Sequence, residues 1–274
     1  MNRNSSTAAV RRDLVTGLFL VFCLACFSLM PGARGEEPKR DPTLIQRENA
    51  KPGATDWQLT RVRLDKMDGC RSPWIEGYCS RQSVKAGESI EIMVSTDPPE
   101  KFKIEIFRMG YYGGRGARLM SVLGPFAGKK QPTPPVGPRA IRECRWEATT
   151  RLAIPADWPS GVYLGRMTLL PPTENTGPWQ SYVVFIVRDE RPADILFQCS
   201  DNTWQAYNVW PDKYSVYTHP KGGQGPWADA SFDRPYGREA QFLAWSTTRS
   251  PWAAASSSPS SSRWRTSSNS TATT

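Results

Sequence analysis

Histidine is scarce in this chain, and its cysteines do not form a metal-ligand pattern. His219 is the single histidine among 274 residues. A conventional Ser–His–Asp triad would therefore have to use that one side chain, and a site with several imidazole ligands is excluded. No Cys-x-x-Cys pair occurs after residue 35, which disfavours a zinc site.

Long basic runs are also missing. The formal charge is +9, yet no basic run exceeds two residues. Nucleic-acid-binding proteins usually concentrate basic side chains in a patch or stripe, so we expect no nucleic-acid partner. A scattered excess suits a solvated surface that faces an anionic envelope or other polyanions.

The N-terminus has the pattern of an export signal. Basic residues precede an apolar run at residues 14–30, and the small residues Ala33 and Gly35 follow it. This predicts a signal peptide over residues 1–35, a secreted or periplasmic protein, and no membrane attachment after cleavage. An uncleaved anchor is disfavoured because the run is short and interrupted. Arg11-Arg12 fits a loose twin-arginine pattern, so the Sec and twin-arginine routes both remain open.

Four cysteines would meet an oxidising compartment, and they permit three disulfide pairings. They are Cys70, Cys79, Cys144 and Cys199. We favour a bond between Cys70 and Cys79, because the short segment between them contains a proline and a glycine and can close a loop.

Residues 36–73 are predicted to be a polar leader and the entry to a sandwich, with ordered structure starting near Trp57. The prolines at positions 38, 42 and 52 support this interpretation. Residues 74–188 are predicted to form an immunoglobulin-like β-sandwich. Apolar residues alternate with other residues at Ile90, Ile92 and Val94, which is the period of a half-buried strand.

Short strands separated by Gly and Pro turns recur through the predicted sandwich, and helical periodicity is absent. The next strand has Phe107 out of register with its other apolar residues. Seven strands are predicted: 83–88, 90–94, 102–107, 119–123, 146–154, 162–170 and 182–187. A proline-rich loop is expected at 125–138.

A second domain is predicted to begin after a charged linker at 188–192. We expect residues 193–245 to be the N-terminal part of an incomplete α/β domain, whose first strand is the apolar run beginning at Ile195. Residues 246–274 are mostly Ser and Thr and are predicted to be a disordered tail. A shift of reading frame after Trp245 would also explain this tail, because the shifted codons can encode a core-like sequence.

The glycine-rich segment 110–116 invites comparison with a phosphate-binding loop. Its spacing fits neither nucleotide fingerprint, and strands rather than a helix are predicted on both sides. We therefore predict a tight hairpin or a contact loop between domains.

Aromatic and polar residues are dense just after the predicted first strand of the second domain. They are Trp204, Tyr207, Trp210, Tyr214, Tyr217, Trp227 and Tyr236, together with Asn202, Gln205, Asn208, Asp212 and Asp233. Packing between the domains and a sugar-stacking surface are two interpretations. A third is a metal site, because phenolate and carboxylate oxygens can hold ferric iron. Cys199 with His219 is a rival nucleophile and base.

Several motifs follow one another along the chain: Ile75-Glu76-Gly77-Tyr78 with Ser83-Val84, Phe107-Arg108-Met109-Gly110-Tyr111-Tyr112-Gly113-Gly114, Trp158-Pro159-Ser160-Gly161-Val162-Tyr163, Thr203-Trp204-Gln205-Ala206-Tyr207-Asn208 and Ser231-Phe232-Asp233-Arg234-Pro235-Tyr236. Together, and in this order, they resemble the large-subunit family of N,N-dimethylformamidase. Pro211-Asp212 departs from the family pattern, which has small glycines there.

The resemblance implies a β-sandwich followed by an amidotransferase-like α/β domain. It also implies hydrolysis of a small amide by a mononuclear iron held by two tyrosines and a glutamate. Tyr207 matches the first tyrosine and Tyr236 is our candidate for the second, while the glutamate would lie further along than this chain extends. A small subunit or a homo-oligomer would be the partner.

Two hypotheses follow. The chain is a fragment of a secreted, iron-dependent amide hydrolase and is inactive alone, with no catalytic residue assigned. Alternatively, it is a non-catalytic secreted module that binds a glycan or a protein.

Overall fold

The computed structural model describes residues 41–62, 70–170, 178–193, 195–219, 221–223 and 225–237. The predicted signal peptide, the Ser/Thr-rich tail and the frame-shift position at Trp245 lie outside these residues. Within them, no helix has the length and apolarity that crossing a bilayer requires.

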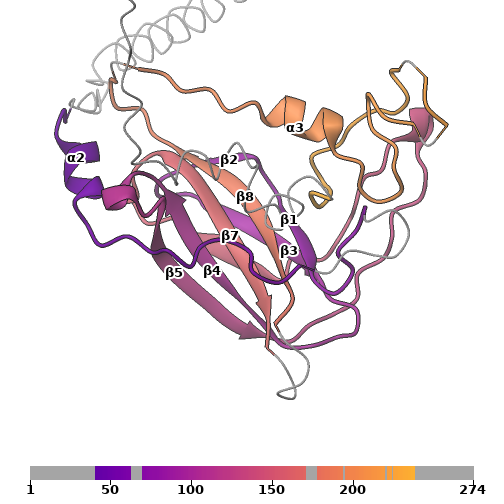
Figure 1. Cartoon of the computed structure of the whole chain (residues 1–274), viewed down its shortest axis with the longest axis horizontal. Coiled ribbons are helices and arrows are strands. Elements are labelled where there is room, and N and C mark those ends of the chain that lie inside the picture. Colours follow the sequence, from indigo (N-terminus) through magenta and orange to yellow (C-terminus); the bar gives the residue numbers. More distant parts are fainter. Residues whose placement is uncertain are drawn as a thin grey trace, which may run out of the picture. The chain divides into compact units, whose positions relative to one another are not determined.

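The described chain contains two sheets, most of whose strands are labelled in Figure 1. The three-stranded sheet has the order β1-β3-β6, with β1 at Glu76–Cys79, β3 at Ser89–Ser95 and β6 at Thr150–Ala153. The five-stranded sheet has the order β2-β8-β7-β4-β5. Its strands are β2 (Ser83–Lys85), β8 (Gln180–Arg188), β7 (Gly161–Leu169), β4 (Phe102–Met109) and β5 (Ala117–Phe126). All pairings are antiparallel except that of β2 with β8.

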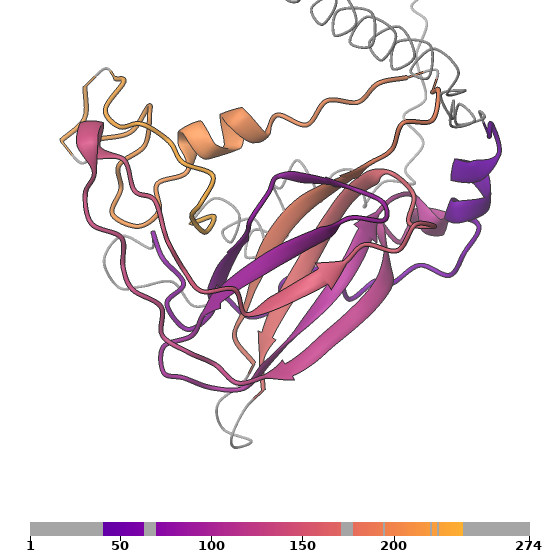
Figure 2. The same ribbon diagram turned by 180° about the vertical axis from the view of Figure 1, so that it is seen from behind.

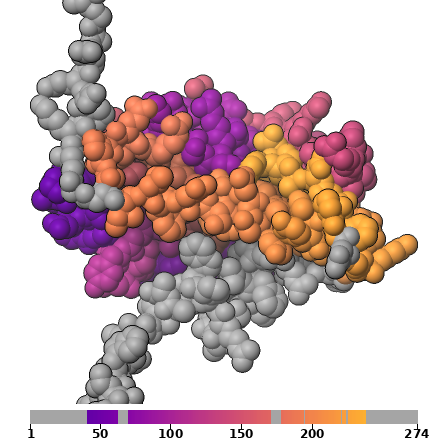
Figure 3. Space-filling view, turned by 90° about the horizontal axis from the view of Figure 1, so that it is seen from above, coloured from indigo at the N-terminus to yellow at the C-terminus, as the bar shows by residue number. Residues whose placement is uncertain are grey.

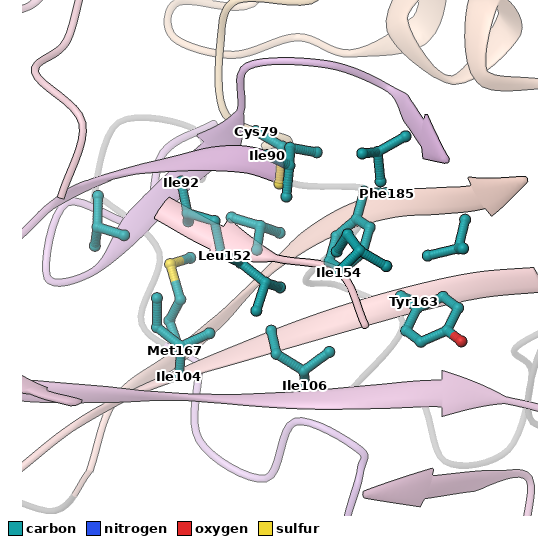
Figure 4. Packing of buried hydrophobic residues seen from close by; sticks show 14 of the residues in the cluster. Cys79, Ile90, Ile92, Ile104, Ile106, Leu152, Ile154, Tyr163, Met167 and Phe185 are labelled. Carbon is teal, nitrogen blue, oxygen red and sulfur yellow. The ribbon is translucent and has the colours of Figure 1, made fainter. Parts of the chain in front are cut away.

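The two sheets share one apolar core, so the predicted β-sandwich is confirmed. Figure 2 shows the smaller sheet in front of the larger one, and Figure 4 shows side chains from both meeting between them. Alternation along β3 sends Ile90, Ile92 and Val94 into this core, as predicted. The opposite wall is supplied by Ile104 and Ile106 of β4 and by residues of β7 and β8.

Every strand predicted within the sandwich has a counterpart, and one sandwich strand was missed. The missed strand is β1, whose four residues are all buried and therefore show no alternation of apolar and polar residues. The fifth predicted strand is shorter than expected, because only Thr150–Ala153 of residues 146–154 is a strand. The proline-rich loop begins after β5 ends at Phe126.

The outer face of the five-stranded sheet is also covered, which explains Phe107. This residue points away from the sandwich core and packs with Trp57 and Ala117 in a separate apolar cluster. The Trp57 indole Nε1 donates a hydrogen bond to the Arg115 carbonyl at 2.9 Å. The chain near Trp57 therefore lies across the outer face and closes it.

A short helix, α2 (Leu44–Asn49), precedes this covering segment and was not predicted from the sequence. It lies beside the 3-10 turn η1 (Tyr112–Gly114), as Figure 1 shows. Its Glu48 is buried, so the leader contributes to packing before Trp57.

The glycine-rich segment forms the hairpin between β4 and β5, as predicted. Gly113, Gly114 and Gly116 have φ values of 66°, 85° and 87°, which favour glycine. Asn49 Oδ1 accepts hydrogen bonds from the amides of Tyr111 and Tyr112. Gly114, Arg115 and Gly116 bond to carbonyls within the loop. These amides are therefore not available to cradle a phosphate.

Glu48 is the centre of a buried polar network that ties α2 to this hairpin. Its carboxylate accepts hydrogen bonds from the Tyr112 hydroxyl at 2.9 Å, Arg118 at 2.8 Å and Lys51 at 2.6 Å. The Tyr112 hydroxyl in turn accepts a bond from Arg108 at 2.8 Å. Burial disfavours the ionised carboxylate, but these donors outweigh it and hold the pKa of Glu48 below its usual value.

The favoured disulfide between Cys70 and Cys79 is not formed. The Cys79 thiol is free and lies between the sheets, in the sandwich core. Cys144 belongs to a second apolar cluster with Tyr78 and Met93. Neighbouring residues of a strand point to opposite faces, so Tyr78 and Cys79 enter different clusters. Burial raises the pKa of Cys79 to about 12, so its thiol stays protonated.

The strand predicted to open the second domain is also not formed. β8 ends at Arg188, where the sandwich was predicted to end. Ile195, Leu196 and Phe197 are then 83%, 93% and 81% exposed and belong to no strand. A strand needs a neighbour to satisfy its backbone groups, and no described residue pairs with this one.

Removing a buried side chain from the shared core should destabilise the sandwich. We expect Ile104→Ala to lower the free energy of unfolding by about 2–5 kcal/mol, because it leaves a cavity at a fully buried position. Val122→Ala on β5, where the side chain is 54% exposed, should change it by less than about 0.5 kcal/mol. Urea denaturation measures both, and equal effects would contradict the placement of Ile104.

The Glu48 network should make stability depend on pH in a defined direction. A carboxyl whose folded pKa is lowered contributes stability above its unfolded value of 4.5, and this is lost as the pH falls through the folded pKa. The difference in unfolding free energy between the native chain and Glu48→Gln should therefore shrink from about pH 7 to about pH 3. Glu147→Gln at an exposed position is the control, and a constant difference for Glu48→Gln would contradict the network.

Candidate functional site

The predicted aromatic and polar segment is organised around helix α3 (Asp201–Tyr207). Asp201 and Gln205 are four residues apart, so they share one face of the helix. Gln205 is 2% exposed, which shows that this face is turned inward, and Asn208, just after the helix ends, is 3% exposed.

Arg234 fixes this inward face. Its guanidinium is 2% exposed and donates to the backbone carbonyls of Trp210 and Gln205, both at 2.9 Å. Its Nε bonds to the Ser231 carbonyl at 3.2 Å and to Gln205 Oε1 at 3.3 Å. Burial lowers the pKa of Arg234 to about 10, so the group remains a cation near neutral pH. One buried cation thus joins α3, the turn after it and the later loop.

The Asn208 side chain is a second residue that holds the segment together. Its Nδ2 donates to Gln205 Oε1 at 3.0 Å and to the Pro235 carbonyl at 2.9 Å. Its Oδ1 accepts from the amides of Trp210 and Gly237, at 3.2 and 3.0 Å. All these bonds bring residues near position 236 against the helix end.

Trp210 docks the segment on the sandwich. It is fully buried, and its indole Nε1 donates to Glu76 Oε2 on β1 at 2.8 Å. Arg71 Nε bonds to the other carboxylate oxygen at 3.1 Å, and its guanidinium lies over the Trp210 ring at 5.1 Å. Trp146 meets the indole edge-on at 6.1 Å. For Trp210, therefore, the packing interpretation of the aromatic cluster holds.

Backbone and ionic contacts extend this attachment. The Cys144 amide donates to the Asp233 carbonyl at 2.7 Å, and the Asp229 amide donates to the Arg139 carbonyl at 3.0 Å. Arg142 forms an ion pair with Asp212. The loop that precedes β6 is thereby held to the segment at several points.

Tyr207 lies outside the inward face of α3. Two residues of helix correspond to a rotation of about 200°, so Tyr207 points away from Gln205. Its ring packs on Tyr217 with centroids 4.8 Å apart, and the two side chains are 52% and 56% exposed. The Val216 amide bonds to the Ala206 carbonyl at 3.1 Å and holds the two tyrosines together.

Tyr236 has different surroundings. Its hydroxyl is buried and has no hydrogen-bond partner among the described residues, and the same holds for Gln205 Nε2. Burial raises the pKa of Tyr236 to about 12, although the nearby Gln205 amide acts in the opposite direction. The structure thus gives Tyr207 an exposed phenol and Tyr236 a buried, unsatisfied one.

Cys199 and His219 lack the features of a nucleophile and its base. Burial, with Asp201 nearby, raises the pKa of Cys199, whereas a nucleophilic cysteine needs a lowered one. His219 packs between Tyr214 and Trp227, at ring-centroid distances of 5.0 and 4.6 Å. Its Nδ1 accepts a hydrogen bond from the Lys221 amide. These contacts describe an aromatic loop cluster.

The family described as N,N-dimethylformamidase beta subunit-like, C-terminal, matches residues 103–259, more than half of the chain. The chain belongs to this family. The resemblance drawn from the sequence motifs is thereby confirmed. The matched region of the N,N-dimethylformamidase beta subunit-like family begins within β4 and includes α3, Tyr207 and Tyr236. No curated protein matches the chain significantly.

The iron site implied by this family consists of two phenolates and a carboxylate. The described residues contain no group of three or more His, Cys, Asp or Glu side chains that could hold a metal. The two candidate phenols have different surroundings, since Tyr207 is 52% exposed and the Tyr236 hydroxyl is buried. The assignment of Tyr207 and Tyr236 as iron ligands therefore stays a prediction.

Sequence reasoning missed Arg234, Glu76 and Arg71 as the residues that build this region. Arg234 and Glu76 lie within motifs shared with the N,N-dimethylformamidase family, where tyrosines drew attention first. The available signal was a charged residue inside an otherwise apolar or aromatic motif, because fully buried Arg and Glu are rare unless they are paired.

The indole hydrogen bond can be tested by Trp210→Phe, which keeps an aromatic ring and removes the donor. The unfolding free energy should fall by about 1–3 kcal/mol, because buried Glu76 Oε2 loses its partner. Amide exchange should accelerate at residues 205–210 and stay slow in β4 and β7. The control Tyr111→Phe changes a 70% exposed ring and should leave both unchanged. Unaltered exchange at residues 205–210 would argue against this docking contact.

Proposed function

We propose that this chain carries the β-sandwich and the beginning of the catalytic domain of a secreted or periplasmic amide hydrolase. The observation that carries the proposal is the family match over residues 103–259, which spans both tyrosines and the buried joint around Arg234. The family takes its name from an enzyme that cleaves the C–N bond of a small amide.

Tyr207 and Tyr236 are proposed as phenolate ligands of iron in the complete catalytic domain. A bound ferric ion would supply a Lewis acid and would activate a water molecule. A carboxylate ligand would come from residues outside the described chain. Asn208, which holds Gln205 and the Pro235 carbonyl, sets the distance between α3 and the backbone next to Tyr236.

The chain alone is proposed to be inactive. Three consecutive apolar side chains at 195–197 are more than 80% exposed, which supports the view that the sheet of the second domain requires more strands. The proposed ligands are likewise incomplete. A chain without these strands and ligands would fold as a sandwich with an attached segment and would bind iron weakly.

A chain translated in the alternative reading frame after Trp245 tests the proposed hydrolase function, and the chain as given tests whether it is inactive alone. The chain as given should remain colourless with ferric iron and should release no dimethylamine from N,N-dimethylformamide. A chain returned to the alternative frame after Trp245 should bind one iron, gain a visible phenolate-to-iron band and release dimethylamine. Tyr207→Phe and Tyr236→Phe should each abolish the band, whereas Tyr111→Phe should keep it.

Either of two results would contradict this proposal. One is a visible band and hydrolysis by the chain as given. The other is a folded, frame-corrected chain that stays colourless and inactive.

A binding module is the second candidate. The exposed Tyr207–Tyr217 pair offers two adjacent ring faces, which is the type of surface that stacks on a sugar or covers part of a protein partner. Retention of the chain on a polysaccharide column, lost in Tyr217→Ala, would favour this function. Absence of retention would leave the hydrolase fragment as the better account.

A further inference from the structure

Two buried polar groups of the segment around α3 have no hydrogen-bond partner among the described residues. They are the side-chain nitrogen Nε2 of Gln205 and the hydroxyl of Tyr236. Figure 3 shows α3 and the later loop, coloured from orange to yellow, packed together on one face of the molecule. Buried polar groups are nearly always paired, so a buried donor and a buried hydroxyl left over in one region call for an explanation.

The orientation of the Gln205 amide is fixed by its neighbours. Its Oε1 accepts a hydrogen bond from Asn208 Nδ2 at 3.0 Å and another from Arg234 Nε at 3.3 Å. Both of these nitrogens can only donate, so exchanging the oxygen and nitrogen of the Gln205 amide would set donors against a donor. Gln205 Nε2 is therefore a donor whose direction is set by two other side chains.

The backbone on both sides of Tyr236 is held to the same residues. The Pro235 carbonyl accepts a bond from Asn208 Nδ2 at 2.9 Å, and the Gly237 amide donates to Asn208 Oδ1 at 3.0 Å. Asn208 thus fixes the Gln205 amide and the position of Tyr236 together. Burial raises the pKa of Tyr236, and the Gln205 amide acts against this, which is the effect of a donor near the phenol oxygen.

We propose that Gln205 is a positioning residue, whose Nε2 donates to the Tyr236 oxygen when that oxygen acts as an anionic ligand. The inference rests on the proposed function, in which Tyr236 binds iron as a phenolate. A phenol proton needs an acceptor, and no described residue supplies one. An anionic oxygen needs a donor instead, and Gln205 Nε2 is nearby and unused. The surroundings of Tyr236 therefore suit a phenolate better than a phenol.

The proposed role separates the two candidate ligands. Tyr207 points away from Gln205 and is 52% exposed, so water can solvate its oxygen. The Tyr236 oxygen is shielded from water and must receive its donor from the protein. A donor bond to an anion is stronger than one between neutral groups, and bonds of this kind orient metal ligands.

Gln205→Glu tests the donor with little change of shape. The carboxylate keeps an oxygen for Asn208 and Arg234 but replaces Nε2 by an acceptor, so the Tyr236 hydroxyl should become a donor. The full chain is isotope-labelled at the tyrosine ζ carbon and measured by NMR without metal. The signal that Tyr236→Phe removes should move in Gln205→Glu, and the other tyrosine signals should stay. The matched control Asn202→Asp makes the same chemical change at an exposed position of α3 and should move none of them.

The same contact can be followed from the Gln205 side, without altering that residue. Tyr236→Phe should shift the side-chain NH2 signal of Gln205, because the ring remains and only the oxygen is lost. Tyr217→Phe, at a 56% exposed ring, should leave this signal unchanged. This measurement decides the question if Gln205→Glu does not fold.

The positioning role and the proposed function can fail separately. The NMR measurements contain no iron, so an unmoved Tyr236 signal in folded Gln205→Glu, or an unmoved Gln205 signal in Tyr236→Phe, would overturn the positioning role alone. In the chain translated in the alternative frame, Gln205→Glu should shift the visible iron band and Asn202→Asp should not. An iron band that Tyr236→Phe leaves intact would overturn the ligand assignment, and with it the role of Gln205, even where the NMR contact is found.

Discussion

The buried carboxylate of Glu76 is the contact on which the arrangement of the described chain depends. It lies on β1, where one oxygen bonds to Arg71 and the other accepts the Trp210 indole proton. A carboxylate in such a position is unfavourable unless both oxygens are satisfied. The strand and the segment around α3 therefore depend on each other. Glu76 of β1 supplies the acceptor, and Trp210 supplies the donor that would otherwise have to be a water molecule. The sandwich and the region around α3 are coupled at this point.

The sandwich could largely be predicted because its signals are local. Ile90, Ile92 and Val94 show the alternation of a strand with one apolar face, and the structure places them in the core. β1 gave no such signal, since its residues are buried on both faces. The helix α2 was missed for a related reason. Glu48 is stabilised by Arg118 and Tyr112, which are distant in sequence and cannot be inferred from the polar leader itself.

The position of the candidate region along the chain could be predicted from the sequence, but the buried contacts that hold it together could not. Family motifs and the density of aromatic residues indicated residues 201–237, and Trp210, Tyr207 and Tyr236 all belong to the organised segment. Its buried joints could not be read from composition, because Arg234 and Asn208 act through backbone carbonyls and amides that have no sequence signature. The prediction of a Cys70–Cys79 disulfide was wrong, because sequence spacing shows that a loop can close but not toward which face of the sheet each side chain points.

The cover on the outer face of the five-stranded sheet has a consequence for where the folding unit begins. Trp57 packs on Phe107 and is bonded to Arg115, and the Arg61 carbonyl accepts a bond from Gln180 at the start of β8. A protein trimmed to the first strand would keep every strand of the sandwich, yet it would present bare apolar surface on β4. The autonomous unit is therefore longer than its sheets, and it includes Trp57, which lies in a stretch without regular secondary structure.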